Sequence, residues 1–250
     1  MAFSFDLTGR TALVTGASSG LGTRFGRILA ASGANVALGA RRADRLAALA
    51  AEIGPQAAAI RMDVAREADI IAGFDEADAI FGKVDTVIAN AGVDGAGMAT
   101  AISEEDIEHT LAINLKGAIL TAREGARRMM AHGITNGRIV LIASITATEP
   151  SPGLVAYAAS KAGVVQAGRT LAREWARAGI NVNTVSPGYI STAINDAWFD
   201  TEPGKKQIAK FPKRRLMGEE GLDAMMLFLC SDASEFVTGT NFVLDDGQTL

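Results

Sequence analysis

The stretch Thr11-Ala12-Leu13-Val14-Thr15-Gly16-Ala17-Ser18-Ser19-Gly20-Leu21-Gly22 decides the fold of this chain. Its first five residues predict a buried β-strand, and its glycines lie where that strand would turn into the helical pattern of residues 23–31. Glycine permits a tight turn and a close approach to a phosphate, whose charge is favoured by the free N–H groups at the start of a helix. The stretch therefore predicts a dinucleotide pyrophosphate site at Gly16, Ser18, Ser19, Gly20 and Leu21, although a plain glycine-rich turn has the same composition.

Short apolar runs alternate with Ala-rich amphipathic segments along the rest of the chain. The predicted strands are residues 11–15, 35–39, 57–63, 85–89, 138–143, 180–186 and 241–244. Near-continuous hydrophobicity, as in Ile139-Val140-Leu141-Ile142, is typical of parallel strands covered on both faces. We therefore predict an α/β fold in which residues 1–250 form a single Rossmann-type, doubly wound domain. Its seven-stranded parallel sheet would be flanked by helices on both faces.

Charge and cysteine content exclude several classes of protein. The 24 Lys and Arg residues against 28 Asp and Glu residues give a formal net charge of −4, so no global field attracts nucleic acid or an anionic membrane. The start of the chain lacks the basic and apolar regions of a leader, and no apolar run approaches a membrane span. We expect a cytoplasmic protein that binds neither nucleic acid nor membrane. Cys230, within an apolar stretch, is predicted to be a buried structural thiol.

The residues after the second predicted strand bear on the choice of cofactor. A dinucleotide fold that takes NAD usually places an acidic side chain there, against the ribose 2′-hydroxyl. Here Ala40 holds that position, and Arg41 and Arg42 follow with planar donor groups suited to a 2′-phosphate. The sequence therefore predicts NADP(H) as the cofactor. NAD stays an alternative, because the arginines also suit a solvated helix start and Asp44 lies within reach of the ribose.

Catalytic groups are expected at the carboxyl ends of the later strands, where open α/β sheets place their crevice. The strand 138–143 ends at Ser144, and Tyr157 and Lys161 lie four residues apart on the next helical pattern, on one face. A phenol has an ordinary pKa near 10, and lowering it by about three pH units requires roughly 4 kcal/mol of preferential phenolate stabilisation. The charges of Lys161 and an oxidised nicotinamide are candidates for that stabilisation. Taken alone, such a tyrosine–lysine pair is also typical of a solvated helix face.

Several spaced motifs together give a resemblance that extends over essentially the whole chain. In chain order these motifs are the glycine motif 15–22, Asn90-Ala91-Gly92, a lone Asn114, Ser144, Tyr157 with Lys161, and Pro187-Gly188 with Thr192. The chain resembles the short-chain dehydrogenase/reductase family, in particular its NADP(H)-dependent carbonyl reductases and secondary alcohol dehydrogenases. The resemblance implies hydride transfer between a nicotinamide and a small ketone, aldehyde or secondary alcohol.

The resemblance also implies a role for each matched residue. Tyr157 would exchange a proton with the substrate oxygen, Ser144 would orient that oxygen, and Lys161 would lower the Tyr157 pKa and hold the nicotinamide ribose. Asn114 would anchor a water that links Lys161 to solvent. The other matched residues would bind the cofactor: Gly16, Ser18, Gly20 and Leu21 the pyrophosphate, Arg41 the 2′-phosphate, Asp63 and Val64 the adenine, Asn90 the region beside the ribose, and Ile190 and Thr192 the carboxamide. Ala91, Gly92, Pro187 and Gly188 complete the predicted cofactor site.

Two departures from the family pattern bear on the alternatives. Ala89 stands where the family has a second asparagine before Ala-Gly, which costs little because Asn90 is retained. Family members that reduce acyl chains on a carrier protein resemble one another in a basic residue where this chain has Ala178, before Gly179. This departure weakens the assignment as a 3-oxoacyl-carrier-protein reductase, which stays an alternative, as does a non-catalytic NADP-sensing module. The intact Ser144, Tyr157 and Lys161 argue against the sensor.

Three further expectations concern the surface. Residues of about 190–215 are expected to form a substrate lid, whose basic side chains suit either an anionic substrate or, more usually, a solvated loop. His109 and His132 have no metal-ligand spacing, so we predict surface or helix-end positions for them and no metal site. The amphipathic segments 103–132 and 157–178 carry more apolar surface than one sheet face can cover, and we expect a homotetramer.

Overall fold

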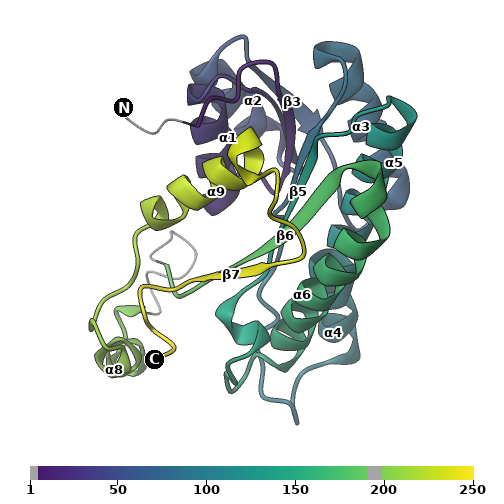
Figure 1. Ribbon diagram of the computed structural model, residues 1–250. Coiled ribbons are helices and arrows are strands. Elements are labelled where there is room, and N and C mark those ends of the chain that lie inside the picture. Colours follow the sequence, from purple (N-terminus) through teal and green to yellow (C-terminus); the bar gives the residue numbers. More distant parts are fainter. Residues whose placement is uncertain (1–4, 191–198) are drawn as a thin grey trace.

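The computed structural model describes residues 5–190 and 199–250, and its centre is a parallel sheet with the strand order β3-β2-β1-β4-β5-β6-β7 (Figure 1). The strands are β1 (Thr11–Thr15), β2 (Asn35–Ala40), β3 (Ala57–Arg61), β4 (Thr86–Ala89), β5 (Gly137–Ile142), β6 (Ile180–Pro187) and β7 (Asn241–Leu244). All neighbouring strands are parallel. The predicted seven-stranded Rossmann-type sheet is confirmed, because the continuous apolar runs are buried from both sides.

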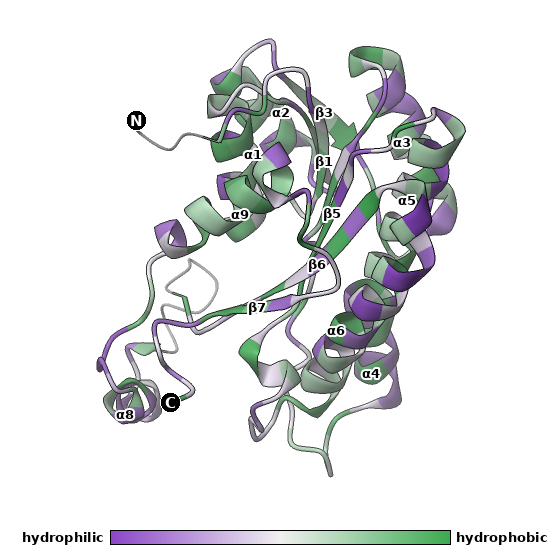
Figure 2. Cartoon of the chain, viewed as in Figure 1, coloured by the Kyte–Doolittle hydropathy of each residue, from purple (hydrophilic) through white to green (hydrophobic). Residues whose placement is uncertain are grey.

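Helices cover both faces of the sheet. They are α1 (Gly20–Ala31), α2 (Ala43–Ile53), α3 (Glu67–Phe81), α4 (Glu104–Leu111), α5 (Ala118–Ala131), α6 (Val155–Trp175), α8 (Glu202–Lys210) and α9 (Asp223–Cys230). The side chains of α1, α2 and α9 share one hydrophobic cluster with the sheet, and those of α3, α5 and α6 share the other. Alternate strand residues supply the two clusters, Val140 one and Leu141 the other. Figure 2 shows the hydrophilic residues on the outer turns of α3, α5 and α6.

The order of the strands determines where a ligand can bind. The chain runs outward from β1 to β3, then returns to place β4 beside β1 and continues to β7 in the other direction. In open α/β sheets the crevice lies at the carboxyl ends of the strands where this reversal occurs. The ends of β1 and β4 therefore mark the site. Figure 1 shows α8 and the end of β7 on one side of the molecule, well away from α2 and α3.

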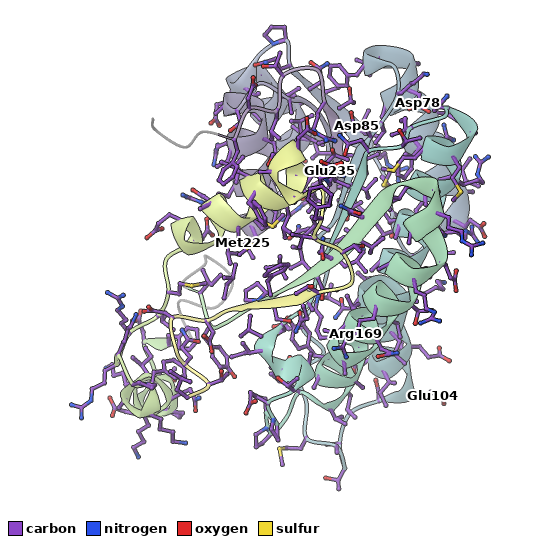
Figure 3. All side chains as sticks on the ribbon, in the orientation of Figure 1. Asp78, Asp85, Glu104, Arg169, Met225 and Glu235 are labelled. Carbon is purple, nitrogen blue, oxygen red and sulfur yellow. The ribbon has the colours of Figure 1, made fainter. Side chains whose placement is uncertain are left out.

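A partly buried ionic cluster lies at the opposite, amino ends of the strands. Arg10 pairs with Asp85 at 3.4 Å and also with Asp232, while Arg138 donates to the Ser231 carbonyl at 3.2 Å. Asp85 is labelled in Figure 3, at the end of the sheet away from α8. Burial raises the pKa of Asp85, against the effect of its hydrogen bond with Thr86 and the nearby Arg10. The cluster is distant from the carboxyl ends, and we assign it a structural role.

The predicted positions of Cys230 and of the two histidines agree with the structure. Cys230 is buried, and burial raises its pKa to about 12, so its thiol is not activated. His109 lies in the last turn of α4 and His132 is the C-cap residue of α5, both exposed.

Within residues 5–190 and 199–250, no helix combines the length and apolar character that a membrane crossing requires. The same ranges contain no group of His, Cys, Asp and Glu side chains arranged to hold a metal ion.

Candidate active site

The turn between β1 and α1 forms a narrow backbone cradle. Gly16 has a φ of +71°, and a Cβ there would lie 2.8 Å from the Cα of Ala91. Gly22 is packed as closely, since its Cβ would lie 2.3 Å from the Gly16 oxygen. Gly20 has a φ of +51° and open space where its Cβ would lie. The turn therefore requires glycine at its base and leaves the surface at Gly20 accessible to a ligand.

The N-terminus of α1 supplies the donors of this cradle. Ser19 is the N-cap residue, yet in the described structure its hydroxyl does not cap the helix, and the first turn carries no acidic side chain. Free N–H groups and the positive end of the helix dipole favour an anion at this place. The residues present fit a pyrophosphate. The predicted residues Gly16, Ser18, Ser19, Gly20 and Leu21 all lie on this turn.

Arg42 is hydrogen-bonded to the two serines of the cradle. Its Nε and Nη2 atoms donate to Ser18 Oγ at 3.0 and 2.9 Å, and Nη2 also donates to Ser19 Oγ at 2.7 Å. Ala40, the last residue of β2, is buried, and Arg41 is exposed beside it. The sequence predicted Arg42 near the ribose but gave no sign of this bridge to the serines. The bridge brings a guanidinium and two hydroxyls together at the edge of the pyrophosphate cradle.

The ends of β1 and β4 are tied together beside the cradle. Asn90 Nδ2 donates to the Thr15 carbonyl at 2.9 Å, and Thr15 Oγ1 accepts the N–H groups of Asn90 and Ala91 at 3.0 and 3.1 Å. A Cβ on Gly92 would lie 3.6 Å from Lys161 Nζ, so this segment reaches the predicted catalytic groups. Asn90 therefore supplies a side-chain hydrogen bond that joins the end of β4 to β1. Ala89, where the family has a second asparagine, is buried within β4.

Residues predicted at the adenine and carboxamide lie at the same edge of the sheet. Asp63 and Val64 follow β3 after Met62; Asp63 Oδ1 accepts the Ala65 N–H at 3.0 Å, and Val64 is buried. Pro187 ends β6, and the Gly188 N–H donates to the Leu244 carbonyl at 2.9 Å. Ile190 is buried and forms a β-bridge with Met217. Thr192 lies outside the described residues, as does part of the predicted lid.

Asn114 lies on a π-helical turn, Ala112–Gly117, between α4 and α5. Its side-chain amide pairs with the Val93 backbone: Oδ1 accepts the N–H and Nδ2 donates to the carbonyl, both at 2.8 Å. Nδ2 also donates to Ser160 Oγ at 3.2 Å, and Ser160 Oγ donates to the Tyr157 carbonyl at 2.6 Å. Asn114 therefore links the segment after β4 to α6. A π-turn widens a helix locally and is frequent at functional sites.

Tyr157 and Lys161 share one face of α6, as their spacing predicted. Lys161 is 4% exposed, its Nζ donates to the Ile142 carbonyl at 2.8 Å, and it lies 5.5 Å from the centre of the Tyr157 ring. Burial lowers the pKa of Lys161 from 10.5 to about 8. Burial raises the pKa of Tyr157, and the hydrogen bond with Ser144 acts in the other direction. The lowering of the Tyr157 pKa by Lys161 and an oxidised nicotinamide stays a prediction.

Ser144 lies between the end of β5 and the 3₁₀ turn Ile145–Ala147, within hydrogen-bonding reach of Tyr157. Its Oγ accepts the Thr146 N–H at 3.2 Å and the Thr146 hydroxyl at 3.0 Å. The structure thus brings Ser144, Tyr157 and Lys161 together at the carboxyl end of β5. These groups can bind a substrate oxygen and exchange a proton with it.

Tyr189 is a candidate site residue that sequence reasoning did not single out. Its hydroxyl lies 3.2 Å from Ser151 Oγ, and its ring stacks on Phe211 with 5.7 Å between the centres. Gln248 holds its backbone, because Oε1 accepts the Tyr189 N–H at 2.7 Å and Nε2 donates to the carbonyl at 3.0 Å. The charge of Tyr189 contributes to the raised pKa of Tyr157. Its position directly after Pro187-Gly188 was the available signal.

Comparisons with known proteins show which proteins this chain is similar to. Residues 16–249 match the family model described as enoyl-(acyl carrier protein) reductase. The chain is 38% identical over 251 residues to D-threitol dehydrogenase of Mycolicibacterium smegmatis, covering 99% of this chain and 96% of the relative.

Solved structures give the same result for the fold. A short-chain type dehydrogenase/reductase from Mycobacterium marinum is 34% identical with a TM-score of 0.92, covering 98% of this chain and 97% of that one. A gluconate 5-dehydrogenase from Burkholderia cenocepacia, in complex with NADP and tartrate, has the same TM-score of 0.92 and coverage of 98% and 97% at 32% identity. The glycine cradle, the convergence of Ser144, Tyr157 and Lys161, and these likenesses lead to one conclusion: the chain belongs to the short-chain dehydrogenase/reductase family, whose members include oxidoreductases of hydroxy compounds.

Proposed function

We propose that this protein is an NADP(H)-dependent oxidoreductase that interconverts a secondary alcohol and a ketone on a small polyhydroxylated substrate. The observation that carries the proposal is the convergence of Ser144, Tyr157 and Lys161 beside the glycine cradle. Gly92 connects the two, because a Cβ on it would lie 3.6 Å from Lys161 Nζ. A dinucleotide held at the cradle would therefore extend toward these residues.

The cofactor would be held by the residues already described. The backbone of Gly16, Gly20 and Leu21 would bind the pyrophosphate, and Lys161 would donate to a ribose hydroxyl. The remaining members of the proposed cofactor site are Ser18, Ser19, Arg41, Arg42, Asp63, Val64, Asn90, Ala91, Gly92, Tyr157, Pro187, Gly188, Ile190 and Thr192. When bound, the nicotinamide supplies or accepts the hydride.

The protein's own side chains transfer the proton to and from the substrate oxygen. In reduction, the Tyr157 hydroxyl gives its proton to that oxygen, and in oxidation the phenolate takes it back. Ser144 hydrogen-bonds the same oxygen. Because burial raises the pKa of Tyr157, the free phenol is a poor base at neutral pH, and a positive charge beside it is needed for oxidation. Lys161 can supply that charge below about pH 8, where its ammonium is protonated.

Arg42 supports NADP(H) over NAD(H). Its guanidinium lies 2.9 Å from Ser18 Oγ and 2.7 Å from Ser19 Oγ, at the side of the cradle where a dinucleotide presents its adenosine ribose. A planar donor group and two hydroxyls suit a 2′-phosphate, and no carboxylate follows β2 directly to repel it. The NADP in the Burkholderia relative's structure is consistent with this choice. Asp44, exposed in the first turn of α2, leaves NAD as the alternative.

Polar groups near Tyr157 support a substrate with several hydroxyls. The hydroxyls of Ser151 and Tyr189 lie 3.2 Å apart, and the charge of Asp94 is near enough to raise the pKa of Tyr157 further. These groups can hydrogen-bond the hydroxyls of a polyol, and a hydrocarbon substrate would make no use of them. D-threitol and gluconate, named for two relatives, are molecules of this kind. We propose that residues of about 190–215 form the lid over this substrate, within a single domain and a cytoplasmic homotetramer.

Steady-state kinetics on the purified protein test the proposal. We expect NADP-dependent oxidation of tetritols and aldonates and NADPH-dependent reduction of the matching ketoses and keto acids. Tyr157→Phe removes the proton donor and should lower kcat by about a hundred- to ten-thousandfold while cofactor binding is kept. A variant that keeps a tenth of the wild-type rate would show that the acid/base group lies elsewhere.

A 3-oxoacyl-carrier-protein reductase is the second candidate, since the matched family model carries the name of an enzyme acting on acyl carriers. The same assay distinguishes the two, because turnover of a 3-oxoacyl thioester without turnover of any polyol would replace the polyol assignment.

A further inference from the structure

Thr146 makes two hydrogen bonds to the hydroxyl of Ser144. Its backbone N–H and its own hydroxyl donate to Ser144 Oγ at 3.2 and 3.0 Å. Both side chains are buried, with 8% of Ser144 and 7% of Thr146 exposed. The contact is local, because Ser144 is the N-cap residue of the 3₁₀ turn Ile145–Ala147 and Thr146 lies within that turn.

This arrangement leaves the Ser144 hydroxyl one role. A serine hydroxyl has one O–H to donate and two lone pairs that accept. Thr146 occupies both lone pairs, so Ser144 can only donate to a third group. That third group is Tyr157: burial raises the pKa of this phenol, and its hydrogen bond with Ser144 acts in the opposite direction. A substrate oxygen placed beside the phenol would accept a hydrogen bond from the same Ser144 hydroxyl.

We propose that Thr146 is a positioning residue, which fixes Ser144 as a hydrogen-bond donor toward the phenolate of Tyr157 and the oxygen that reacts with it. The inference rests on the proposed function, since it concerns the same proton transfer. Thr146 itself bonds only to Ser144 among the side-chain hydrogen bonds of the described residues and acts through that residue.

The direction of the hydrogen bond matters for the reaction. During oxidation, the proton leaves the substrate hydroxyl for the Tyr157 phenolate, and Ser144 keeps its own proton throughout. Donation by Ser144 favours the phenolate and the developing alkoxide. A Ser144 hydroxyl with a free lone pair would instead accept the O–H of Tyr157, which favours the protonated phenol and opposes the reaction. Thr146 prevents that second arrangement.

Substitutions of similar size test the role. Thr146→Val removes the side-chain donor, and we expect a fall in kcat of about three- to tenfold with little change in KM, the loss of one neutral hydrogen bond. Thr146→Ser restores the hydroxyl and should restore the rate. Thr148→Val is the matched control, because Thr148 is exposed on the same segment and donates only to the Ile145 carbonyl at 3.3 Å. In a Ser144→Ala background, Thr146→Val should have no further effect.

A titration without substrate measures the same effect independently of turnover. The chain has two tyrosines, so a protein labelled with ¹³C at the tyrosine ζ carbon gives two signals, and Tyr189→Phe identifies them. We expect Thr146→Val to move the ionisation of Tyr157 to higher pH and Thr148→Val to leave it in place.

Each outcome bears on a specific statement. The positioning role is overturned if Thr146→Val matches Thr148→Val in both measurements, or if its effect persists undiminished without Ser144. If Tyr157→Phe remains active, the proposed function fails, while the titration still decides whether Thr146 controls the phenol.

Discussion

The stability of this protein should depend on pH through Lys161, because the fold buries an ammonium group that has few partners. Burial lowers its pKa from 10.5 to about 8. Below pH 8 the group is charged in both the folded and the unfolded chain, and its burial weakens the fold. Between about pH 8 and 10.5 the folded protein has already lost the proton that the unfolded chain still binds. The free energy of unfolding therefore rises with pH across this window.

The size of this effect follows from the change in pKa. A shift from 10.5 to about 8 corresponds to about 3 kcal/mol, at about 1.4 kcal/mol for each pH unit. Lys161→Met removes the titrating group but keeps an apolar stem of similar length. It also removes the hydrogen bond to the Ile142 carbonyl, a loss that is the same at every pH. The difference in stability between wild type and variant should therefore increase by about 3 kcal/mol in favour of wild type from pH 7 to pH 11.

Urea unfolding at a fixed protein concentration measures this difference at each pH. Lys116→Met is the control, because Lys116 is an exposed lysine on the π-turn and its charge is not buried. A difference between wild type and Lys161→Met that stays constant from pH 7 to pH 11 would refute the reasoning. It would mean that the Lys161 ammonium is solvated or paired as well in the folded protein as in the unfolded chain.

Three further predictions concern the cofactor, the substrate and the assembly. Replacing Arg41 and Arg42 with glutamine should weaken NADPH binding by about ten- to a hundredfold and leave NADH binding unchanged, measured by fluorescence titration, whereas equal losses would assign the arginines a structural role. Tyr189→Phe should raise KM about three- to tenfold for a tetritol and leave that for a monohydric secondary alcohol unchanged, and an equal change for both would contradict a hydroxyl-specific contact. Sedimentation should show a tetramer, and a species of 25.9 kDa alone at micromolar concentration would exclude it.

Most of the fold could be predicted from the sequence because its signals are local and repeated. Each strand is a short apolar run bounded by turn residues, and every strand was expected within two residues of its observed bounds. The candidate catalytic residues could be proposed from the sequence for a different reason. Ser144, Tyr157 and Lys161 are far from the glycine cradle in sequence, and their spacing does not show that they share a site with it. The resemblance to the family connected the two.

The contacts that were not predicted depend on tertiary packing. The residues Ala112–Gly117 have an ordinary helical pattern, and the π-turn arises where Asn114 pairs with the Val93 backbone. The bridge from Arg42 to Ser18 and Ser19 joins residues on two different βα turns. Tyr189 and Gln248 meet because β6 and β7 are neighbours. No short-range pattern encodes contacts of this kind.

The glycine cradle has a consequence for how cofactor preference can change. The backbone at Gly16 and Gly22 leaves no room for a Cβ, so this part cannot vary, and it would hold the pyrophosphate that NAD and NADP have in common. The side chains of Ser18, Ser19, Arg41 and Arg42 surround this backbone, and both arginines are exposed. If these side chains hold the adenosine ribose as proposed, affinity for dinucleotides in general and discrimination between them would reside in different atoms. We therefore expect that a library varying these four side chains alone can exchange one coenzyme for the other while the fold and the reacting groups stay as they are.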